Sequence, residues 1–356
     1  MDSRSAYTRK SIKSGTPGSV HCSYFYGQGT KASSARKHRR VIWGVITALL
    51  AVAVIVLITA FQGGADKQTA ALPTVTIGTI PTAMTTPTST TPSPTPTPAV
   101  TPQPIDSTAW GSKFPGKFTD GEVIQTGNTY KSANINVTVT MVQENGVTYY
   151  LAGIYMTDLK YFRTAFANDE FDNGSETTPA IAKNNNAIIA INGDYCSYNK
   201  GPVLRNGVLY RDQNYRDVLV MYNDGTMETY TKDEFDMEAA QSKGAYQIWT
   251  FGPMLLDGGQ PMTEFNSSLG KLNPRTAVGY YEPGHYCFIV VDGRQGDYSK
   301  GMTFADLSQL FYDLGCKAAF NLDGGQTSEM AFMGEFANQP YHGGRAVSDI
   351  LYIADE

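Results

Sequence analysis

The chain has 356 residues, with 28 Lys and Arg against 33 Asp and Glu, which gives a formal net charge of −5. Residues 1–40 hold nine basic residues and one acid, so residues 41–356 hold 19 basic and 32 acidic residues. This acidic remainder argues against a nucleic-acid partner, because phosphate-backbone binding needs a broad cationic surface. Four cysteines in a chain of this length exclude a disulfide-rich scaffold.

The N-terminal segment, residues 1–40, is rich in Ser, Lys, Arg and Gly and shows no hydrophobic periodicity. Such a composition is typical of a disordered segment. We interpret it as a basic cytoplasmic tail that lies against anionic membrane lipid.

An uncharged run of 21 residues follows, from Val41 to Phe61. About 20 apolar residues span the hydrocarbon core of a bilayer, so the run predicts a transmembrane helix. A cleaved signal peptide is the alternative, but its apolar region is shorter, and forty polar residues precede this run. The basic cluster Arg36–Arg40 lies just before the run. The positive-inside rule therefore predicts a single-pass protein of the cell membrane, with a cytoplasmic N-terminus and an extracellular C-terminal part.

Residues 62–105 read as a stalk, because Pro occurs eight times and Thr nine times between Pro81 and Pro104. A segment of this kind forms no core and favours an extended spacer. From residue 106 to residue 356 the composition is that of a globular protein, and about 250 residues suffice for one large domain.

Strand and helix patterns are mixed in this domain. Apolar runs predict strands at 135–142, 148–156, 187–192, 217–222, 245–251, 277–281, 285–291, 317–322 and 347–353. Helical periodicity predicts helices at 158–166, 178–185, 232–241 and 303–314. We therefore expect a single α+β (mixed α/β) domain, with a mixed, twisted sheet flanked by helices.

Two of these strands end in the same Asp-Gly pattern, at Asp292-Gly293 and at Asp323-Gly324. The order strand, helix, strand over residues 285–322 indicates a βαβ unit with parallel strands. Ligands gather at the carboxyl ends of such strands, so we expect both motifs at one pocket. A simple turn is the alternative interpretation of each Asp-Gly pair.

Polar residues at strand ends form the predicted site. The candidate catalytic residues are Asp323, Asp292 and Arg275, and the candidate binding residues are Asn192, Asp194, Arg294, Asn321, Gly324, Gly325, Ser328 and Arg345. Arginines grip phosphate oxygens in pairs, and carboxylates and amides bind sugar hydroxyls, so the set suits an anionic ligand rich in hydroxyls. Ion pairs that merely close a sheet end are the alternative.

Cys287 and Cys316 begin the two strands that end in Asp-Gly, so they can be neighbours. A disulfide and two buried free thiols both remain open for this pair. Cys196 is the third cysteine of the domain, so at least one of the three is unpaired within the chain.

Five motifs in this order resemble the phosphodiester glycosidase (uncovering-enzyme) domain family. They are Phe251-Gly252-Pro253, Asn273-Pro274-Arg275-Thr276, Val291-Asp292-Gly293-Arg294, Asn321-Leu322-Asp323-Gly324-Gly325 and Arg345-Ala346-Val347-Ser348, preceded by Asn192-Gly193-Asp194-Tyr195. The resemblance covers about residues 180–355. One departure is Gly324-Gly325-Gln326-Thr327-Ser328-Glu329, where the family usually has Gly-Gly-Gly-Ser-Ser-Thr.

The resemblance implies a hydrolase that cleaves a sugar-1-phosphodiester, and the predicted membrane helix makes it a membrane-tethered extracytoplasmic one with a cell-surface glycan or exopolysaccharide as substrate. In this hypothesis Arg275, Arg294 or Arg345 holds the phosphate, and Asp323 or Asp292 activates water or stabilises an oxocarbenium-like state. The two alternatives are a non-catalytic module that binds cell-wall polysaccharide and a metal-dependent phosphodiesterase that uses Asp194, Asp292 and Asp323. The sequence requires no cofactor, although Ca²⁺ is compatible with these acidic residues.

Overall fold

The computed structural model describes residues 108–265 and 267–356. The predicted basic tail (1–40), membrane helix (41–61) and stalk (62–105) all lie outside these residues. Within the described ranges, no helix combines the length and the apolar character needed to cross a bilayer. The described part corresponds to the globular domain predicted from residue 106.

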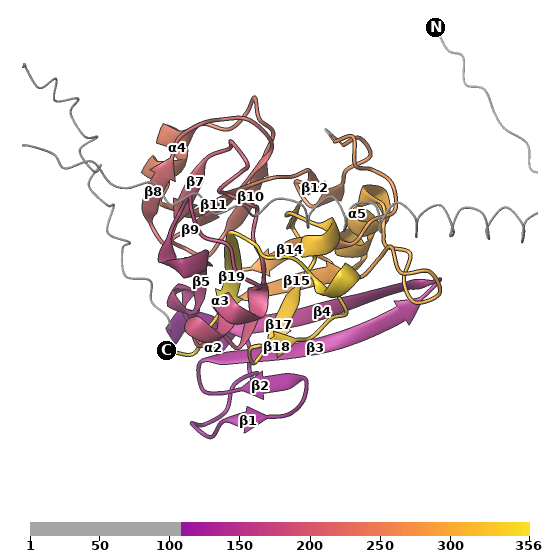
Figure 1. The fold of residues 1–356 in the computed structure, drawn as a ribbon. Helices are drawn as coiled ribbons and strands as arrows, with labels where there is room; N and C mark the ends of the chain where they lie inside the picture. Colours follow the sequence, from indigo (N-terminus) through magenta and orange to yellow (C-terminus); the bar gives the residue numbers. More distant parts are fainter. Residues whose placement is uncertain (1–107, 266) are drawn as a thin grey trace, which may run out of the picture. The chain divides into compact units, whose positions relative to one another are not determined.

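The domain consists mainly of three sheets (Figure 1). The nine-stranded sheet has the order β1 (Ile124–Gln125), β2 (Thr129–Lys131), β3 (Ile135–Glu144), β4 (Val147–Met156), β15 (His285–Val291), β14 (Arg275–Glu282), β16 (Ala318–Asn321), β12 (Met254–Asp257), β13 (Gln260–Pro261). One five-stranded sheet has the order β10 (Met227–Tyr230), β9 (Val218–Tyr222), β11 (Ala245–Thr250), β7 (Val203–Arg205), β8 (Val208–Arg211). The other has the order β18 (Glu335–Phe336), β17 (Met330–Phe332), β6 (Ile189–Asn192), β19 (Asp349–Ile353), β5 (Phe162–Phe166).

Helices are few and short among the described residues. The α-helices are α2 (Thr108–Lys113), α3 (Thr178–Asn184), α4 (Met237–Ser242) and α5 (Phe304–Asp313), and single turns of 3₁₀-helix occur at Leu159–Tyr161, Ala167–Asp169, Gly325–Thr327 and Tyr341–Gly343. The fold is therefore mostly sheet with few helices. The predicted combination of strands and helices in one domain is confirmed in this general form only.

The expected mixed sheet is wrong, because every strand pairing in the described ranges is antiparallel. Strand β14 lies between β15 and β16 and runs antiparallel to both. The strands β15 and β16 consequently run in the same direction, as the βαβ pattern predicts, but they are not hydrogen-bonded to each other. Their carboxyl ends, and with them the two Asp-Gly motifs, lie at the same edge of the nine-stranded sheet.

The helix predicted at 158–166 is also wrong, since a 3₁₀ turn at Leu159–Tyr161 leads directly into strand β5. Alternate residues of β5, from Phe162 to Phe166, are buried, which is the two-residue period of a strand with one face on the core. The helix predicted at 232–241 shortens to α4, which begins after the side-chain cap that Asp236 provides.

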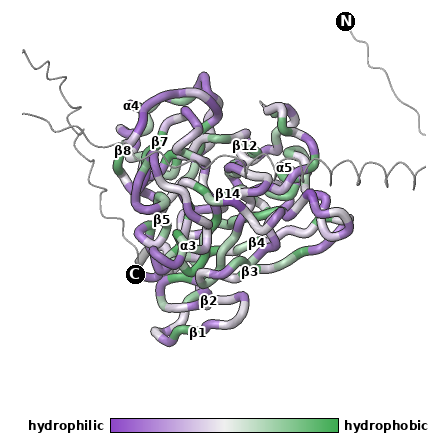
Figure 2. Tube along the Cα trace, viewed as in Figure 1, coloured by the Kyte–Doolittle hydropathy of each residue, from purple (hydrophilic) through white to green (hydrophobic). Residues whose placement is uncertain are grey.

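Helix α5 covers one face of the nine-stranded sheet, beside β12 (Figure 1). Thr303 and Asp306 form the capping box that starts it. Leu307 and Phe311 are fully buried against strand residues such as Ile289, and each such side chain stabilises the fold by about 1.5–3 kcal/mol. In Figure 2 the hydrophobic stretches follow the central strands, whereas the loop beside α4 is hydrophilic.

The predicted proximity of Cys287 and Cys316 is confirmed. Their Sγ atoms lie 3.9 Å apart and both residues are buried as free cysteines beneath α5. Burial raises the pKa of the Cys287 thiol well above its usual range.

Candidate active site

Asp323 lies directly beyond β16, and its carboxylate is held in one orientation. Its Oδ1 accepts a hydrogen bond of 2.9 Å from the backbone N–H of Gly324, and its Oδ2 accepts one of 2.8 Å from the Thr327 hydroxyl. Nη2 of Arg345 lies 3.4 Å from Oδ2. Burial raises the pKa of Asp323 above its usual range, while these hydrogen bonds and Arg345 oppose the shift.

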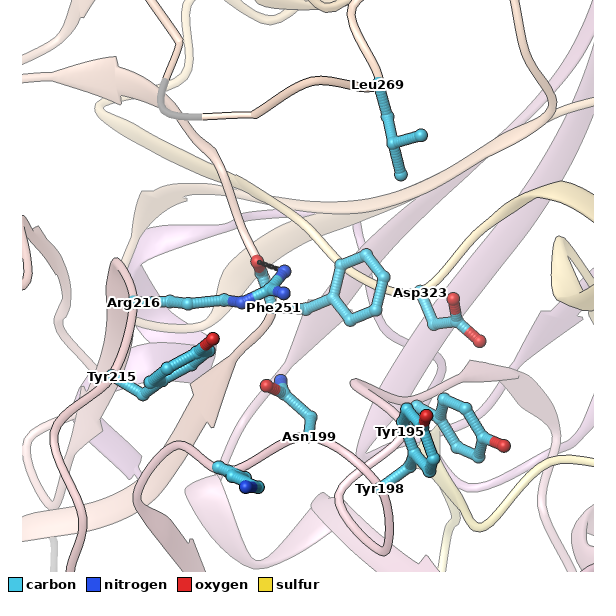
Figure 3. A pocket seen from close by; sticks show the side chains of 9 residues that line it. Tyr195, Tyr198, Asn199, Tyr215, Arg216, Phe251, Leu269 and Asp323 are labelled. Carbon is cyan, nitrogen blue, oxygen red and sulfur yellow. Dashed lines mark hydrogen bonds between the residues drawn. The ribbon is translucent and has the colours of Figure 1, made fainter.

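A cavity of about 550 Å³ opens in front of Asp323 (Figure 3). Its other lining residues are Tyr195, Tyr198, Asn199, Lys200, Tyr215, Arg216, Phe251 and Leu269. The rings of Tyr195 and Tyr198 are stacked, with centroids 5.3 Å apart. Aromatic faces of this kind bind the apolar faces of sugar rings, and the volume lies within the usual range for small-ligand sites.

A second cavity, of about 60 Å³, adjoins the first and shares Phe251, Leu269 and Asp323 with it. Its remaining lining includes Arg275, Arg294, Asn321, Gly324 and Gly325. Two arginines and a glycine loop around a space of this size suit a phosphate group. Asp323 therefore lies where a cavity that is large enough for a sugar meets a small cavity lined by two arginines.

The glycine loop permits Arg294 to lie close to the backbone. Gly325 has φ +77°, and a Cβ placed on it would lie 3.2 Å from Nη2 of Arg294. Asn273 Oδ1 accepts hydrogen bonds from Nε and Nη2 of this guanidinium, at 3.1 and 2.8 Å. Side chains rarely adopt this backbone conformation, so glycine serves both the turn and the close approach.

Arg275 is buried at the start of β14, 4% exposed. Its Nε donates to the carbonyl of Met302, and its Nη2 donates to the carbonyls of Leu269 and Lys271. Burial and the neighbouring Arg294 lower its pKa to about 10, so the guanidinium stays charged at neutral pH. Arg275 therefore brings positive charge to the small cavity and also fixes the loop that carries Leu269.

Asp292 lies at the same sheet edge but lines neither cavity. Its carboxylate accepts hydrogen bonds from Asn338 Nδ2 at 2.7 Å, from the Tyr298 hydroxyl at 2.9 Å and from the backbone N–H of Gln339 at 3.0 Å. Burial raises its pKa. The structure thus places Asp292 as an anchor for the loops behind the site.

Asn192 is also enclosed by the protein. Its Nδ2 donates to the backbone carbonyl of Asp323 at 2.8 Å, and its Oδ1 accepts from the Thr276 hydroxyl at 2.6 Å. Asn192 therefore positions the Asp323 backbone. Asn321 Nδ2 donates to the carbonyl of Gly252, whereas Asn321 Oδ1 and Ser328 Oγ are buried without a partner in the described part of the chain.

Asp194 belongs to a separate buried cluster. Nη2 of Arg205 lies 2.8 Å from Asp194 Oδ1 and 3.2 Å from Asp349 Oδ2, and all three side chains are fully enclosed. Burial, together with the charge of Asp349, raises the pKa of Asp194 to about 7 against the effect of Arg205.

Asp194 and Asp349 of this cluster form, together with Cys196, the one group of three potential metal ligands among residues 108–265 and 267–356. Its residues do not fit a cation site, because Arg205 already places a positive charge against both carboxylates. Asp194, Asp292 and Asp323 are each held by different partners and do not come together as one ligand set.

Several residues of the site were not predicted from the sequence. Tyr195 and Phe251 belong to the quoted motifs without a role there, and Tyr198, Lys200 and Arg216 lie outside the motifs. The signal that could have found Tyr195 and Tyr198 is the spacing Tyr-x-x-Tyr directly after Asn192-Gly193-Asp194. Glu329 was also missed: it is buried and accepts hydrogen bonds from the backbone N–H groups of Thr178 and Arg345, at 3.0 and 2.7 Å.

The chain is similar to a bacterial protein in sequence and to a zebrafish enzyme in fold. The chain is 36% identical over 191 residues to the SPbeta prophage-derived uncharacterized protein YomE of Bacillus subtilis strain 168; the match covers 50% of this chain and only 30% of that protein. The catalytic domain of zebrafish N-acetylglucosamine-1-phosphodiester alpha-N-acetylglucosaminidase, auto-inhibited by its pro-peptide, is similar with a TM-score of 0.52 and 19% identity, covering 67% of this chain and 86% of that one. That likeness shows a shared fold.

A family model described as phosphodiester glycosidase matches residues 185–354. This range contains Asp323, the glycine loop and all nine residues that line the larger cavity. The resemblance predicted from the motifs is thus confirmed, because residues 185–354 match the phosphodiester glycosidase family.

Proposed function

We propose that this domain hydrolyses a sugar-1-phosphodiester by breaking the bond between the anomeric carbon and the phosphate oxygen. The observation that carries the proposal is the position of Asp323 between an aromatic cavity large enough for a sugar and a small cavity lined by Arg275 and Arg294. The match of residues 185–354 to the phosphodiester glycosidase family supports it. So does the fold shared with a zebrafish enzyme whose name describes this reaction.

One carboxylate suffices for this chemistry. Most glycosidases use two carboxyl groups, one of which protonates the glycosidic oxygen because an alkoxide is a poor leaving group. Here the leaving group is a phosphate monoester, whose second pKa is about 6, so it departs without full protonation. Asp323 is the one acidic residue that lines either of the two described cavities, which suits a leaving group that needs positive charge rather than a proton.

In this mechanism the sugar ring lies against Tyr195 and Tyr198, and the phosphate lies in the small cavity beside Arg275 and Arg294. Asp323 stabilises the positive charge that develops at the anomeric carbon and accepts a proton from the attacking water. The new bond joins water oxygen to the anomeric carbon, and the bond to phosphate breaks with its electron pair. The Arg345 side chain is 48% exposed and its Nη2 lies 3.4 Å from Oδ2 of Asp323, although Arg345 lines neither of the two cavities.

The other predicted residues support this arrangement. We assign Asn192 and Asp292 to positioning, because their polar groups contact the protein rather than either cavity. Asp194 stabilises the domain through Arg205. Asn321 lines the small cavity, where its Nδ2 fixes the backbone of Gly252.

We also propose that the chain is tethered to the cell membrane, with this domain outside and a cell-surface glycan or exopolysaccharide as substrate. The uncharged run 41–61, the basic cluster before it and the Thr/Pro-rich segment after it support this topology. Membrane fractionation of expressing cells, followed by protease treatment of intact cells, tests it. A domain found in the soluble fraction, or protected from protease in intact cells, would contradict it.

The reaction itself is tested by incubating the purified protein with a panel of sugar-1-phosphodiesters and identifying the products by mass spectrometry. The proposal expects a free sugar and a phosphate monoester, formed at the same rate with and without EDTA. Saturable binding without product would favour the non-catalytic module instead. Loss of activity in EDTA, restored by Ca²⁺ or another divalent ion, would favour the metal-dependent phosphodiesterase.

A further inference from the structure

Two cations of the larger cavity have no role in the reaction just described. Lys200 and Arg216 line the cavity, and neither takes part in any ion pair within the described residues. Unpaired basic side chains are common on exposed surfaces. Here, however, they lie in a concave site of a domain whose overall charge is acidic, so they create a local attraction for anions.

Arg216 is held in place rather than free in solvent. Its Nη1 donates to the backbone carbonyl of Phe251 at 3.4 Å, and its guanidinium carbon lies 5.7 Å from the Phe251 ring and 5.5 Å from the Tyr215 ring. Figure 3 shows Phe251 between Arg216 and Asp323, so Arg216 lies on the side of the cavity away from the carboxylate. An arginine fixed against rings loses less entropy when it binds an anion.

The space continues beyond Arg216. A third cavity, of about 650 Å³, shares Tyr215, Arg216 and Leu269 with the 550 Å³ cavity beside Asp323, and Lys232 also lines it. All three cavities share Leu269; Arg275 and Arg294 line the small one, Asp323 lines the small one and the one that Arg216 lines, and Lys232 lines the third together with Arg216. Positive charge stands on both sides of the place where the sugar would lie.

We propose that Arg216 and Lys200 form a second anion-binding subsite, and that the substrate is a sugar with a phosphodiester at its anomeric carbon and another at a different hydroxyl. Such a sugar is the repeating unit of a chain joined by phosphodiesters. This inference rests on the proposed function, since the first phosphodiester is the one cleaved beside Asp323. The Tyr195 and Tyr198 rings hold the sugar between the two charges.

The test compares two compounds that differ in one charge. The first is N-acetylglucosamine 1-(methyl phosphate); the second carries an additional methyl phosphodiester on O3, O4 or O6, each isomer being assayed. The wild-type protein should show a kcat/KM about 10-fold higher for at least one two-phosphate isomer, because a charge-assisted hydrogen bond contributes on this scale. The preference should lie in KM and should weaken as the salt concentration rises.

The variant Arg216→Gln should reduce the ratio of kcat/KM for the preferred two-phosphate isomer to kcat/KM for the one-phosphate compound towards one. The matched control is Arg163→Gln, which removes the same charge from strand β5, outside all three cavities. It should leave the ratio of the two kcat/KM values as it is in the wild type.

The failures can be told apart. If the one-phosphate compound is cleaved and no isomer is preferred, the second subsite is refuted while the proposed function stands. The subsite is also refuted if Arg163→Gln changes the ratio as much as Arg216→Gln does. If no compound is cleaved by the wild-type protein, the proposed function fails and this inference fails with it.

Discussion

Asp323 and Asp292 show how two residues in the same short motif acquire different environments. Each follows a buried strand and precedes a glycine, and the two strands end at one sheet edge. Asp323 borders two cavities, whereas Asp292 is surrounded by Asn338, Tyr298 and the backbone of Gln339. The contacts, and not the motif, separate the carboxylate that we propose to react from one that anchors loops.

Asparagine at these two positions should therefore have different effects. We expect Asp323→Asn to lower kcat/KM by at least about 100-fold, because a positioned acid or base contributes at least that much, with little change in Tm. Asp292→Asn should lower the free energy of unfolding by about 1–3 kcal/mol, since a buried carboxylate with three donors is lost. Steady-state kinetics and thermal unfolding of both variants check this pair; full activity of Asp323→Asn would refute its role.

The activity should also depend on pH through Asp323. Burial raises the pKa of this group, so the acidic limb of kcat/KM should lie above the ordinary aspartate value of 3.8, with activity rising as the carboxyl ionises. Arg345 acts in the opposite direction by favouring the carboxylate. Arg345→Gln should therefore move the limb to higher pH. A pH–rate profile in which the limb moves to lower pH would contradict this placement of Arg345.

At the scale of elements, the packing of α5 on the sheet depends on one small residue. Gly279 in β14 lies under the helix, and a Cβ added there would be 2.6 Å from the Phe311 ring and 2.7 Å from Cys287 Sγ. Both contacts are far too short, and both neighbours are fully buried. The glycine lets the helix approach the strands that end at the site.

We expect Gly279→Ala to destabilise the protein by about 1–3 kcal/mol, the usual cost of overpacking a core. The matched control is Gly153→Ala in β4, two strands away, where an added Cβ meets nothing within 4 Å. Urea unfolding of the two variants measures the difference. Equal stability of both would show that α5 does not pack on β14 as described.

The sequence predicted the elements whose signal is local. Strand β15 was predicted with its observed bounds, and helix α5 with nearly its observed bounds. Segment 158–166 was mistaken for a helix, because its spacing of apolar residues fits both periods and pairing with β19 decides the outcome. The insertion of β14 between β15 and β16 could not be predicted either, since strand order follows from long-range contacts.

At the scale of the whole molecule, one buried cluster joins two sheets. Arg205 ends β7 in one five-stranded sheet, Asp349 begins β19 in the other, and Asp194 follows β6 beside it. A single guanidinium thus serves two enclosed carboxylates. Removing one partner of such a group leaves an unpaired buried charge, which is strongly destabilising.

This cluster predicts how stability changes with pH. The pKa of Asp194 is raised from 3.8 to about 7, because the folded protein favours the protonated carboxyl. The resulting contribution to the free energy of unfolding is fully present below pH 3.8 and is lost as the pH rises through about 7. Asp194→Asn removes this titration. The free energy of unfolding of the wild type should therefore fall, relative to that of the variant, between pH 5 and pH 8. Urea titrations at both pH values check the sign; a relative gain of the wild type would contradict it.

The site was predictable in part. The polar motifs mark strand ends, and the structure brings Asp323, Arg275, Arg294, Asn321 and the glycine loop to one small cavity. The lining of the cavity beside Asp323 was not predictable in full. Tyr198 and Arg216 belong to no motif and reach this cavity only through the folding of their loops. Asp194 and Asn192 were predicted as binding residues, but both bind their own protein and line neither cavity, as a polar residue at a strand end can equally well do.

The central claim is that water attacks the sugar carbon and not the phosphorus. Hydrolysis of N-acetylglucosamine 1-(methyl phosphate) in H₂¹⁸O tests this most directly, with mass spectrometry of both products. Attack at the anomeric carbon places ¹⁸O in the hydroxyl of the sugar and none in the methyl phosphate. Isotope found in the phosphate would instead show attack at phosphorus, which is the reaction of a phosphodiesterase, and would refute the proposed mechanism.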